Sequence, residues 1–358
     1  MSERTPVSRI DKAFVGCARG QACVGLDTHK CSIHAAVWID ERMADTWVMP
    51  ADSDKAAMVL ARHRDKIRRV VYEAGPTGFG LARVLRKAGL PVEVVAPGRT
   101  PRPAARENKS DRLDCRRLAQ YAAKGLLEPV AVPTETQEAD RQVLRLRGQL
   151  VAKRRRVKQQ IRSFLLQHAI AEPPALSGWS RRAVAALRAL SLRPLLRLCL
   201  DALVDELDEL DEHVRRATRA VAELAATPRH ADAVAIARTH PGVGQVVAMT
   251  FLVEVYRSGR FDTARQVSRY VGLAPRVRQS GETRREGPIV RTGRGPVRAL
   301  LVEAAWRWRL VDPAAQAIYR RLVRNTGSAK KAIVALARRL ATNLWAMLTR
   351  GQVYRAAA

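Results

Sequence analysis

The spacing of apolar residues changes near residue 133, and the two parts of the chain predict different architectures. Up to that point, short apolar runs alternate with stretches of helical period, which predicts an antiparallel meander of three strands that passes into α/β alternation. A basic tail over residues 1–20 shows no periodicity and is predicted to be flexible. The predicted strands are 22–27, 32–39, 46–49, 69–73 and 92–95, and the predicted helices are 53–66, 78–88 and 111–123.

Long helical patterns dominate the rest of the chain. A basic helix is predicted over residues 138–168, and the prolines at 173 and 174 break the pattern after it. Over residues 196–224, apolar residues alternate spacings of four and three, which predicts a coiled coil. This coiled coil either closes on the preceding helix or pairs with another subunit. An amphipathic helix is predicted over residues 329–347.

Four carboxylates fall at the ends of predicted strands or at the start of a predicted helix. Asp27 and Glu73 each end a strand. Asp111 and Asp114 begin a helix, and their spacing of three places both on one face. Like charges held one turn apart repel unless a cation lies between them, and Mg2+ prefers such oxygen ligands. The alternative is an ordinary acidic first turn favoured by the helix dipole, with the strand-end acids as turn formers.

The net charge changes this picture, because it is +30 at pH 7 and far exceeds what solubility requires. Such an excess predicts a polyanionic partner, since binding releases the counterions condensed on phosphates. A membrane fits less well, because no apolar run of 18 residues and no signal peptide occurs. Five scattered cysteines indicate a reducing cytosol, without disulfides or a zinc site.

Charge is unevenly distributed between the two long helical stretches. The coiled-coil stretch contains an acidic segment over residues 205–212, which disfavours DNA contact and indicates a spacer or oligomerisation element. The helix before it carries a basic run, which predicts either a nucleic-acid contact or a solvated face. The basic run consists of Lys153, Arg154, Arg155 and Arg156.

A helix-hairpin-helix-like element is predicted where two apolar helical stretches flank a Pro-Gly-Val-Gly turn. Its glycines, Gly242 and Gly244, would let backbone N–H groups at a helix N-terminus approach a phosphate. The alternative is a structural corner between two helices. His240, just before the turn, is predicted to cap or pack rather than to bind a ligand.

Ser280 lies among arginines and is therefore a candidate nucleophile. Planar guanidinium groups bind phosphate through two hydrogen bonds, and they can stabilise the charge that develops when a hydroxyl attacks phosphorus. No histidine or lysine lies nearby in the sequence, so a general base would have to come from elsewhere in the fold. The arginines are Arg276, Arg278, Arg284, Arg285, Arg291, Arg294 and Arg298.

Three segments resemble the RuvC-like DEDD domain of the insertion-sequence one-ten family of bacterial transposases, which are RNA-guided recombinases that use a bridge RNA. The segments are Gly-Leu-Asp-Thr-His-Lys at 25–30, Tyr-Glu-Ala-Gly-Pro-Thr-Gly at 72–78 and Lys-Ser-Asp-Arg-Leu-Asp at 109–114. The resemblance covers about residues 21–133 and implies an α/β RNase H-like fold. It also implies Mg2+ or Mn2+ at the four carboxylates, with Lys109 and Arg112 as nucleic-acid contacts beside them.

The stretch from Ser280 to Trp306 resembles the C-terminal transposase domain of the same family. This resemblance implies that Ser280 attacks DNA and forms a phosphoserine link. It also implies that the DEDD site of one subunit completes the active site that holds the serine of another. The chain departs from the family pattern at Arg291, where a lysine is usual, and at Arg294, where an asparagine is common. Both arginines retain the capacity to bind phosphate.

Together these features predict a flexible tail (1–20), a RuvC-like domain (21–133), a coiled-coil region (134–230) and a mainly α-helical, serine-bearing domain (231–358). The predicted function is that of an insertion-sequence recombinase in the bacterial cytoplasm, acting at the nucleoid. It would work as a dimer or tetramer on donor and target DNA with a guide RNA, and no P-loop for ATP occurs. The alternatives are a Mg2+-dependent junction nuclease without a covalent intermediate and a nucleic-acid-binding protein without enzymatic activity.

Overall fold

The computed structural model divides into two compact units, Met1–Thr134 and Glu135–Ala358. It describes residues 6–75, 77–98, 100–101, 111–174, 176–256, 259–280, 283–291 and 293–355, without the side chains of 6–9, 111–113, 278–280 and 283–286. Among these residues, no helix is long and apolar enough to cross a membrane. Each unit is described by itself below.

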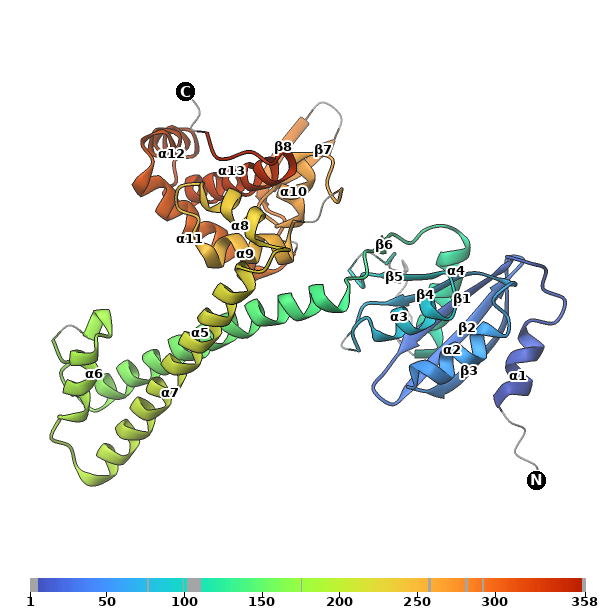
Figure 1. The fold of residues 1–358 in the computed structure, drawn as a ribbon, viewed down its shortest axis with the longest axis horizontal. Helices are drawn as coiled ribbons and strands as arrows, with labels where there is room; N and C mark the ends of the chain where they lie inside the picture. Colours follow the sequence, from blue (N-terminus) through green and yellow to red (C-terminus); the bar gives the residue numbers. More distant parts are fainter. Residues whose placement is uncertain are drawn as a thin grey trace. The chain divides into compact units, whose positions relative to one another are not determined.

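The first unit is built on a six-stranded mixed sheet with the strand order β3-β2-β1-β4-β5-β6 (Figure 1). The first three strands form the predicted antiparallel meander, and β4 and β5 then run parallel to β1. The short strand β6, which the sequence pattern did not predict, pairs antiparallel with β5. The strands are β1 (Ala22–Thr28), β2 (Ser32–Ile39), β3 (Arg42–Pro50), β4 (Ile67–Glu73), β5 (Val92–Val95) and β6 (Pro129–Val130).

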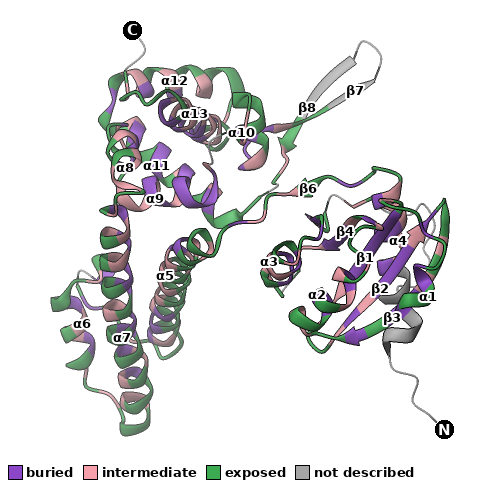
Figure 2. Ribbon diagram, turned by 45° about the vertical axis from the view of Figure 1, so that its right-hand side comes forward, coloured by how far each residue is buried: buried purple, intermediate pink, exposed green. Residues whose placement is uncertain are grey.

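Helices cover the sheet, whose central strands are buried (Figure 2). Helices α2 (Ser53–Ala61) and α3 (Gly80–Lys87) share one apolar core with alternate residues of β1 and β4, such as Leu26 and Tyr72. Helix α4 (Asp111–Ala123) packs against residues of opposite parity, such as Val71. This mixed sheet with helices is RNase H-like, and the predicted α/β fold of the N-terminal part is confirmed.

Part of the segment predicted as a flexible tail is helical. Helix α1 (Pro6–Ala13) places Ile10 and, just beyond its end, Phe14 in the core of the first unit. The ring of Phe14 also stacks on His63, with 4.3 Å between ring centroids. Two apolar residues at a spacing of four are enough to bury one face of a short helix, although they form too short a pattern to predict it.

A single glycine sets the distance between α4 and the sheet. A Cβ atom at Gly25 would lie 2.2 Å from the carbonyl O of Cys115 and 2.4 Å from the backbone N of Ala119. Only a residue without a side chain therefore allows the backbone of α4 to lie directly on β1. This contact fixes where the first turn of α4 lies relative to the end of β1.

The second unit contains an arm made of α5 (Glu135–Gln167) and α7 (Pro194–Ala225). The predicted heptad seam closes on the preceding helix, because its buried residues, among them Leu207 and Val214, face inward along α5. Helix α6 (Arg181–Arg188) and the 3₁₀ turn η1 (Leu176–Gly178) cover the end of the arm and share its apolar core (Figure 1).

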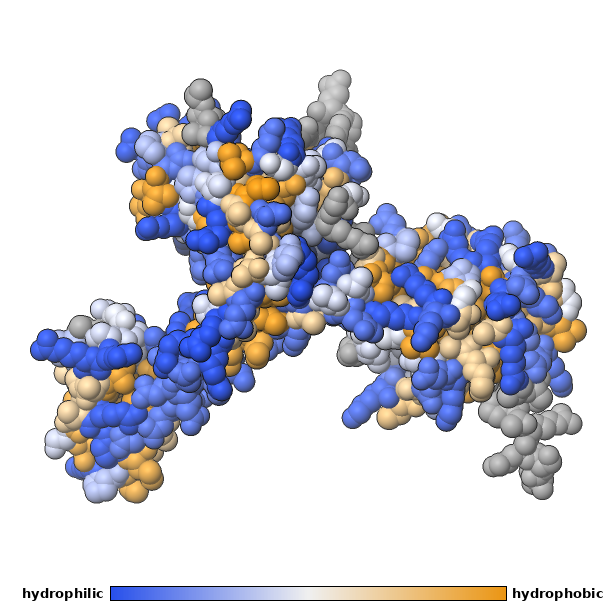
Figure 3. Space-filling view, viewed as in Figure 1, coloured by the Kyte–Doolittle hydropathy of each residue, from blue (hydrophilic) through white to orange (hydrophobic). Residues whose placement is uncertain are grey.

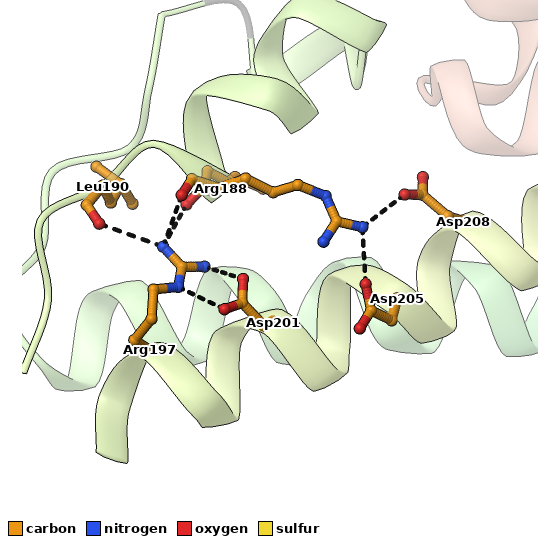
Figure 4. Close-up of polar contacts among 7 residues, drawn as sticks. Arg188, Leu190, Arg197, Asp201, Asp205 and Asp208 are labelled. Carbon is orange, nitrogen blue, oxygen red and sulfur yellow. Dashed lines mark hydrogen bonds and ion pairs between the residues drawn. The ribbon is translucent and has the colours of Figure 1, made fainter. Parts of the chain in front are cut away.

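Several acids of α7, among them two from the acidic segment 205–212, are paired with arginines of the arm. Arg188 of α6 bridges Asp205 and Asp208 at 2.8 Å each, and Arg197 binds Asp201 through two hydrogen bonds (Figure 4). These pairs hold the end of the arm together. Part of the acidity therefore has an intramolecular explanation that the sequence pattern alone did not provide.

The remainder of the second unit is mainly helical, as predicted, and shares one large apolar core. A two-stranded antiparallel hairpin, which was not predicted, projects from this core. The elements are α8 (Ala231–Arg238), α9 (Gln245–Glu254), α10 (Ala264–Tyr270), β7 (Pro275–Ser280), β8 (Thr283–Ile289), α11 (Gly295–Val311), α12 (Pro313–Thr326) and α13 (Ala329–Arg350).

Candidate functional site

Asp27 and Glu73 lie at the carboxyl ends of two neighbouring parallel strands. In the register of β1 and β4, Leu26 pairs with Tyr72, and the two acids come directly after this pair. Successive side chains of a strand point to opposite faces, so Asp27 shares its face with Gly25. Because Gly25 touches α4, both carboxylates lie on the face that α4 covers. The carboxyl ends of parallel strands are where α/β folds build their sites.

Helix α4 places its acids at the same end of the sheet. Asp114 lies in the first turn, next to Cys115, whose backbone contacts Gly25. Burial raises the pKa of the Cys115 thiol to about 11, and the negative charge of Asp27 acts in the same direction. That electrostatic coupling connects Asp27 with the first turn of α4. Asp111 begins the helix, and its side chain lies outside the described part of the chain.

Each described carboxylate contacts a side chain close to it. His29 Nε2 lies 3.1 Å from Asp27 Oδ2, and Arg117 lies 3.6 Å from Asp114. The Thr100 hydroxyl donates a 2.7 Å hydrogen bond to Glu73 Oε1. Among the described side chains, no three carboxylate, histidine or cysteine groups are close enough to hold a metal ion.

The donor set nevertheless fits a hard divalent cation. Asp27, Glu73 and Asp114 come from three elements that meet at one edge of the sheet, and all three offer carboxylate oxygens. Mg2+ prefers oxygen ligands and keeps several of its waters, so it needs few protein ligands. The predicted contact Lys109 lies outside the described residues, and Arg112 is described only as backbone of α4.

Ser280 ends strand β7 at the tip of the hairpin, where it pairs with Thr283 of β8. Its side chain lies outside the described part of the structure, as do those of Arg278, Arg284 and Arg285. The base of the hairpin is anchored in the core, since Val290 N donates a 2.9 Å hydrogen bond to the carbonyl of Ala274. The backbone of Ser280 is therefore held by strand pairing in a hairpin whose base is anchored to the core.

The chain turns sharply where the hairpin returns to the core. Arg291 adopts a left-handed conformation with φ of 52°, which is uncommon for a residue with a side chain. Gly293 has φ of 68°, and a Cβ there would lie 2.2 Å from the carbonyl O of Tyr270. The guanidinium groups of Arg276 and Arg291 are exposed, and Arg298 is half-buried in the first turn of α11.

Arg294 binds a buried carboxylate, which is a role the sequence did not predict. Glu254, the last residue of α9, is only 8% exposed and lies 3.3 Å from the Arg294 guanidinium. Arg145 of α5 binds the same carboxylate through two hydrogen bonds of 2.8 and 3.0 Å. Glu254 therefore joins the arm to the turn behind the serine hairpin. Its apolar sequence neighbours gave no sign of this role.

The two turn glycines predicted to approach phosphate behave differently. Gly242 has φ of 83°, and a Cβ there would lie 2.6 Å from the backbone N of Trp308 and 2.8 Å from the carbonyl O of Ala304. Gly242 is thus required for packing against α11. Gly244 is the N-cap of α9 and has open space where a side chain would be.

His240 packs inside the second unit, in agreement with its predicted role. Its ring lies 4.6 Å from that of Trp308 and 4.3 Å from that of Tyr354, measured between centroids. Burial lowers the pKa of His240 to about 4, although the Pro241 carbonyl and Asp312 act in the opposite direction. The imidazole is therefore neutral at pH 7.

The basic run of α5 divides into exposed and paired residues. Lys153, Arg155 and Arg156 are exposed on the arm, whose visible face is largely hydrophilic (Figure 3). Arg154 is half-buried and forms a 2.9 Å ion pair with Asp211 of α7. Three of the four predicted contacts are thus open to solvent, and one also joins the two helices of the arm.

Comparison with known proteins finds two transposase families. Residues 234–320 match the Transposase IS116/IS110/IS902 family, and residues 24–170 match a further transposase family, that of the IS110 DEDD transposases. The match over residues 24–170 includes β4, α4 and most of β1, and the match over residues 234–320 includes the hairpin that carries Ser280.

Curated relatives are also similar over much of the chain. The putative transposase y4qE of Sinorhizobium fredii is 36% identical over 66% of this chain, which spans 58% of that relative. The putative transposase y4rJ of the same organism is 31% identical, covering 79% of this chain and 78% of the relative. The transposase for insertion sequence element IS1111A of Coxiella burnetii is 26% identical, covering 82% and 81%.

Proposed function

The chain belongs to the IS110 family of insertion-sequence transposases, and from this premise we propose that it cuts and rejoins DNA strands through a serine nucleophile assisted by Mg2+. Ser280 would be the nucleophile. The ion, for which Mn2+ could substitute, would be held by Asp27, Glu73, Asp111 and Asp114.

One observation carries the metal part of this proposal. Asp27 and Glu73 end adjacent strands on the face that α4 covers, and Gly25 holds the first turn of α4, with Asp114, against that face. Residues far apart in sequence thus bring oxygen donors to one edge of the sheet. A bound Mg2+ ion would supply Lewis-acid polarisation of a phosphoryl oxygen.

The role of Ser280 would be nucleophilic. Its Oγ would form a bond to phosphorus while the bond from phosphorus to one bridging oxygen of the DNA strand breaks. The serine proton would pass to a base, and the departing oxygen would take up a proton. Because one phosphate ester replaces another, the link would conserve the energy needed to rejoin the strand, which supports a reaction without ATP. Exposed arginines near the hairpin, such as Arg276 and Arg291, would bind the flanking phosphates.

The proposed partners are donor and target DNA, a structured guide RNA and further copies of the chain. The net charge of +30 supports polyanionic partners, and the exposed Lys153, Arg155 and Arg156 offer a basic surface on the arm. With a guide RNA, target sequence would be read by base pairing rather than by side chains.

The proposal is tested by looking for a covalent protein–DNA species. The full chain would be produced in cells that carry its own genomic flanks, and DNA that stays attached in denaturing detergent would be measured. Ser280→Ala should abolish the covalent species and keep salt-sensitive binding. Asp27→Asn should reduce strand cutting. Undiminished cutting by Ser280→Ala would favour the junction nuclease instead, and binding without cutting or linkage by the unmodified chain would favour a purely binding protein.

A further inference from the structure

An open groove of about 810 Å³ lies beside the serine hairpin in the second unit. Helices α10, α12 and α13 line it together with the start of β7 and Val290, the residue that follows β8. Six of its lining residues are arginines, and none of the lining residues, all of which are described, is acidic. The arginines are Arg265, Arg269, Arg276, Arg321, Arg338 and Arg339.

Most of these arginines have no ion-pair partner among the residues that the structure describes. Apart from Arg269, they make no ion pair or side-chain hydrogen bond with any residue that the structure describes. Elsewhere in the same unit, arginines are commonly paired with acids, as Arg145 is with Glu254 and Arg188 with Asp205. Like charges gathered in one groove repel, so this arrangement favours a bound polyanion.

The other lining residues indicate which part of a polyanion would bind. The lining also contains apolar residues, among them the half-buried Ile318 and Leu322, along which long arginine stems can lie. The hydroxyls of Ser268 and Thr342 already donate to backbone carbonyls of their own helices. None of the described lining residues is aromatic, so the groove lacks the aromatic side chains on which proteins that bind single strands stack successive bases. Guanidinium groups beside apolar side chains suit a sugar-phosphate backbone.

The groove also lies on the strand that ends at Ser280. Arg276 precedes Ser280 by four residues of β7, which in an extended strand corresponds to about 13 Å. Along duplex DNA this distance is about four base steps. We propose that the groove binds the backbone of the DNA duplex that flanks the phosphate attacked by Ser280. This inference rests on the proposed function, because it takes DNA as the substrate of the hairpin.

The proposal is tested by the salt dependence of binding. The full chain, treated with deoxyribonuclease to remove copurified DNA while any copurified RNA is kept, would be titrated with a short DNA duplex at several salt concentrations. Arg321→Gln/Arg338→Gln should lower the slope of log affinity against log salt concentration by about 2, since each phosphate contact contributes roughly 0.9. Arg321→Lys/Arg338→Lys should keep the slope, because the charges remain.

The matched control is Arg320→Gln/Arg324→Gln, which removes the same charge from exposed positions of α12 outside the groove. It should leave the slope unchanged. If the slope decreased equally in the groove variant and in this control, only net charge would matter, and the proposal would be overturned. An unchanged slope in Arg321→Gln/Arg338→Gln would also overturn the proposal. So would a slope that decreases for an RNA duplex of the same sequence but not for the DNA duplex.

The two proposals fail in different ways. If Ser280→Ala abolishes the covalent species while the groove variant binds DNA like the unmodified chain, only the groove proposal is wrong. If the unmodified chain binds no DNA duplex and forms no covalent species, the proposed function itself is wrong. Melting temperatures of the groove variants should match that of the unmodified chain, because Arg321 and Arg338 make no described ion pair.

Discussion

At the scale of single residues, close backbone contacts decide where the candidate site forms. Gly25 belongs to the segment that carries Asp27, yet its role is visible only once α4 lies on the sheet. Gly242 has the same role in the second unit, where it allows the turn before α9 to touch α11. Sequence patterns mark such glycines as unusual, but they do not distinguish a packing contact from a phosphate contact, because both require an absent side chain.

Gly25→Ala provides the test at this scale. The added Cβ would overlap the backbone of Cys115 and Ala119, so α4 must shift. Overpacking of this kind typically destabilises by about 1–3 kcal/mol. We expect a lower urea midpoint for the first unit and reduced strand cutting, because Asp114 moves with α4. Gly80→Ala is the control, since Gly80 lies in helix α3 and no atom lies within 4 Å of the position that its added Cβ would take. An unfolding midpoint equal to that of the control would contradict this account.

At the scale of elements, the sequence predicted the helices and strands in which apolar residues recur at a regular spacing. Strands β1 and β4 and the first turn of α4 were found together with their acids, because apolar runs that end in carboxylates are a local feature. The hairpin β7–β8 was missed, since its strands are rich in arginine and lack apolar alternation. It is held instead by its base, where Val290 pairs with Ala274 and Gly293 touches Tyr270. Contacts between residues that are distant in sequence produce no periodic pattern of apolar residues, so the sequence could not predict the hairpin.

Glu254 gives the prediction at this scale, because it joins three elements. Its carboxylate binds Arg145 of α5 and Arg294 at the start of α11, and it is nearly inaccessible to solvent. Removing one partner of a buried ion pair leaves the other charge without compensation, which destabilises by about 3 kcal/mol. We expect Glu254→Gln and Arg145→Ala to lower the urea midpoint of the second unit substantially.

Arg294→Ala serves as the comparison for Glu254. The Arg294 side chain is 44% exposed, so water screens its contact with Glu254. Its loss should change the unfolding free energy by less than about 1 kcal/mol. We propose that the ion pair of Glu254 with Arg145 of α5 stabilises the fold more than its ion pair with Arg294. Equal losses of unfolding free energy in Arg145→Ala and Arg294→Ala would contradict this.

At the scale of the whole molecule, the large positive charge is divided between structural and available groups. Arginines of the arm bind the acids of α7, whereas Arg155 and Arg156 on α5 and the arginines around the groove, Arg269 excepted, make no ion pair with described residues. The sequence predicted the total charge and hence a polyanionic partner. It could not predict which arginines are available, because pairing is decided by helices that meet only in the folded arm.

The basic run of α5 separates these two roles within four residues. Lys153→Gln/Arg155→Gln/Arg156→Gln should lower the salt dependence of nucleic-acid binding and leave the stability of the arm unchanged, because these side chains are exposed. Arg154→Gln should instead destabilise the arm by about 0.5–1 kcal/mol, since its pair with Asp211 is about one third exposed and partly screened. Asp211→Asn should produce a similar loss, and the double variant should lose little more than either single variant. Binding titrations and urea unfolding of the full chain measure the two effects separately. If Arg154→Gln changed binding as much as its neighbours do and left unfolding unaffected, the whole run would act as a contact surface and the ion pair would contribute nothing to holding α5 against α7.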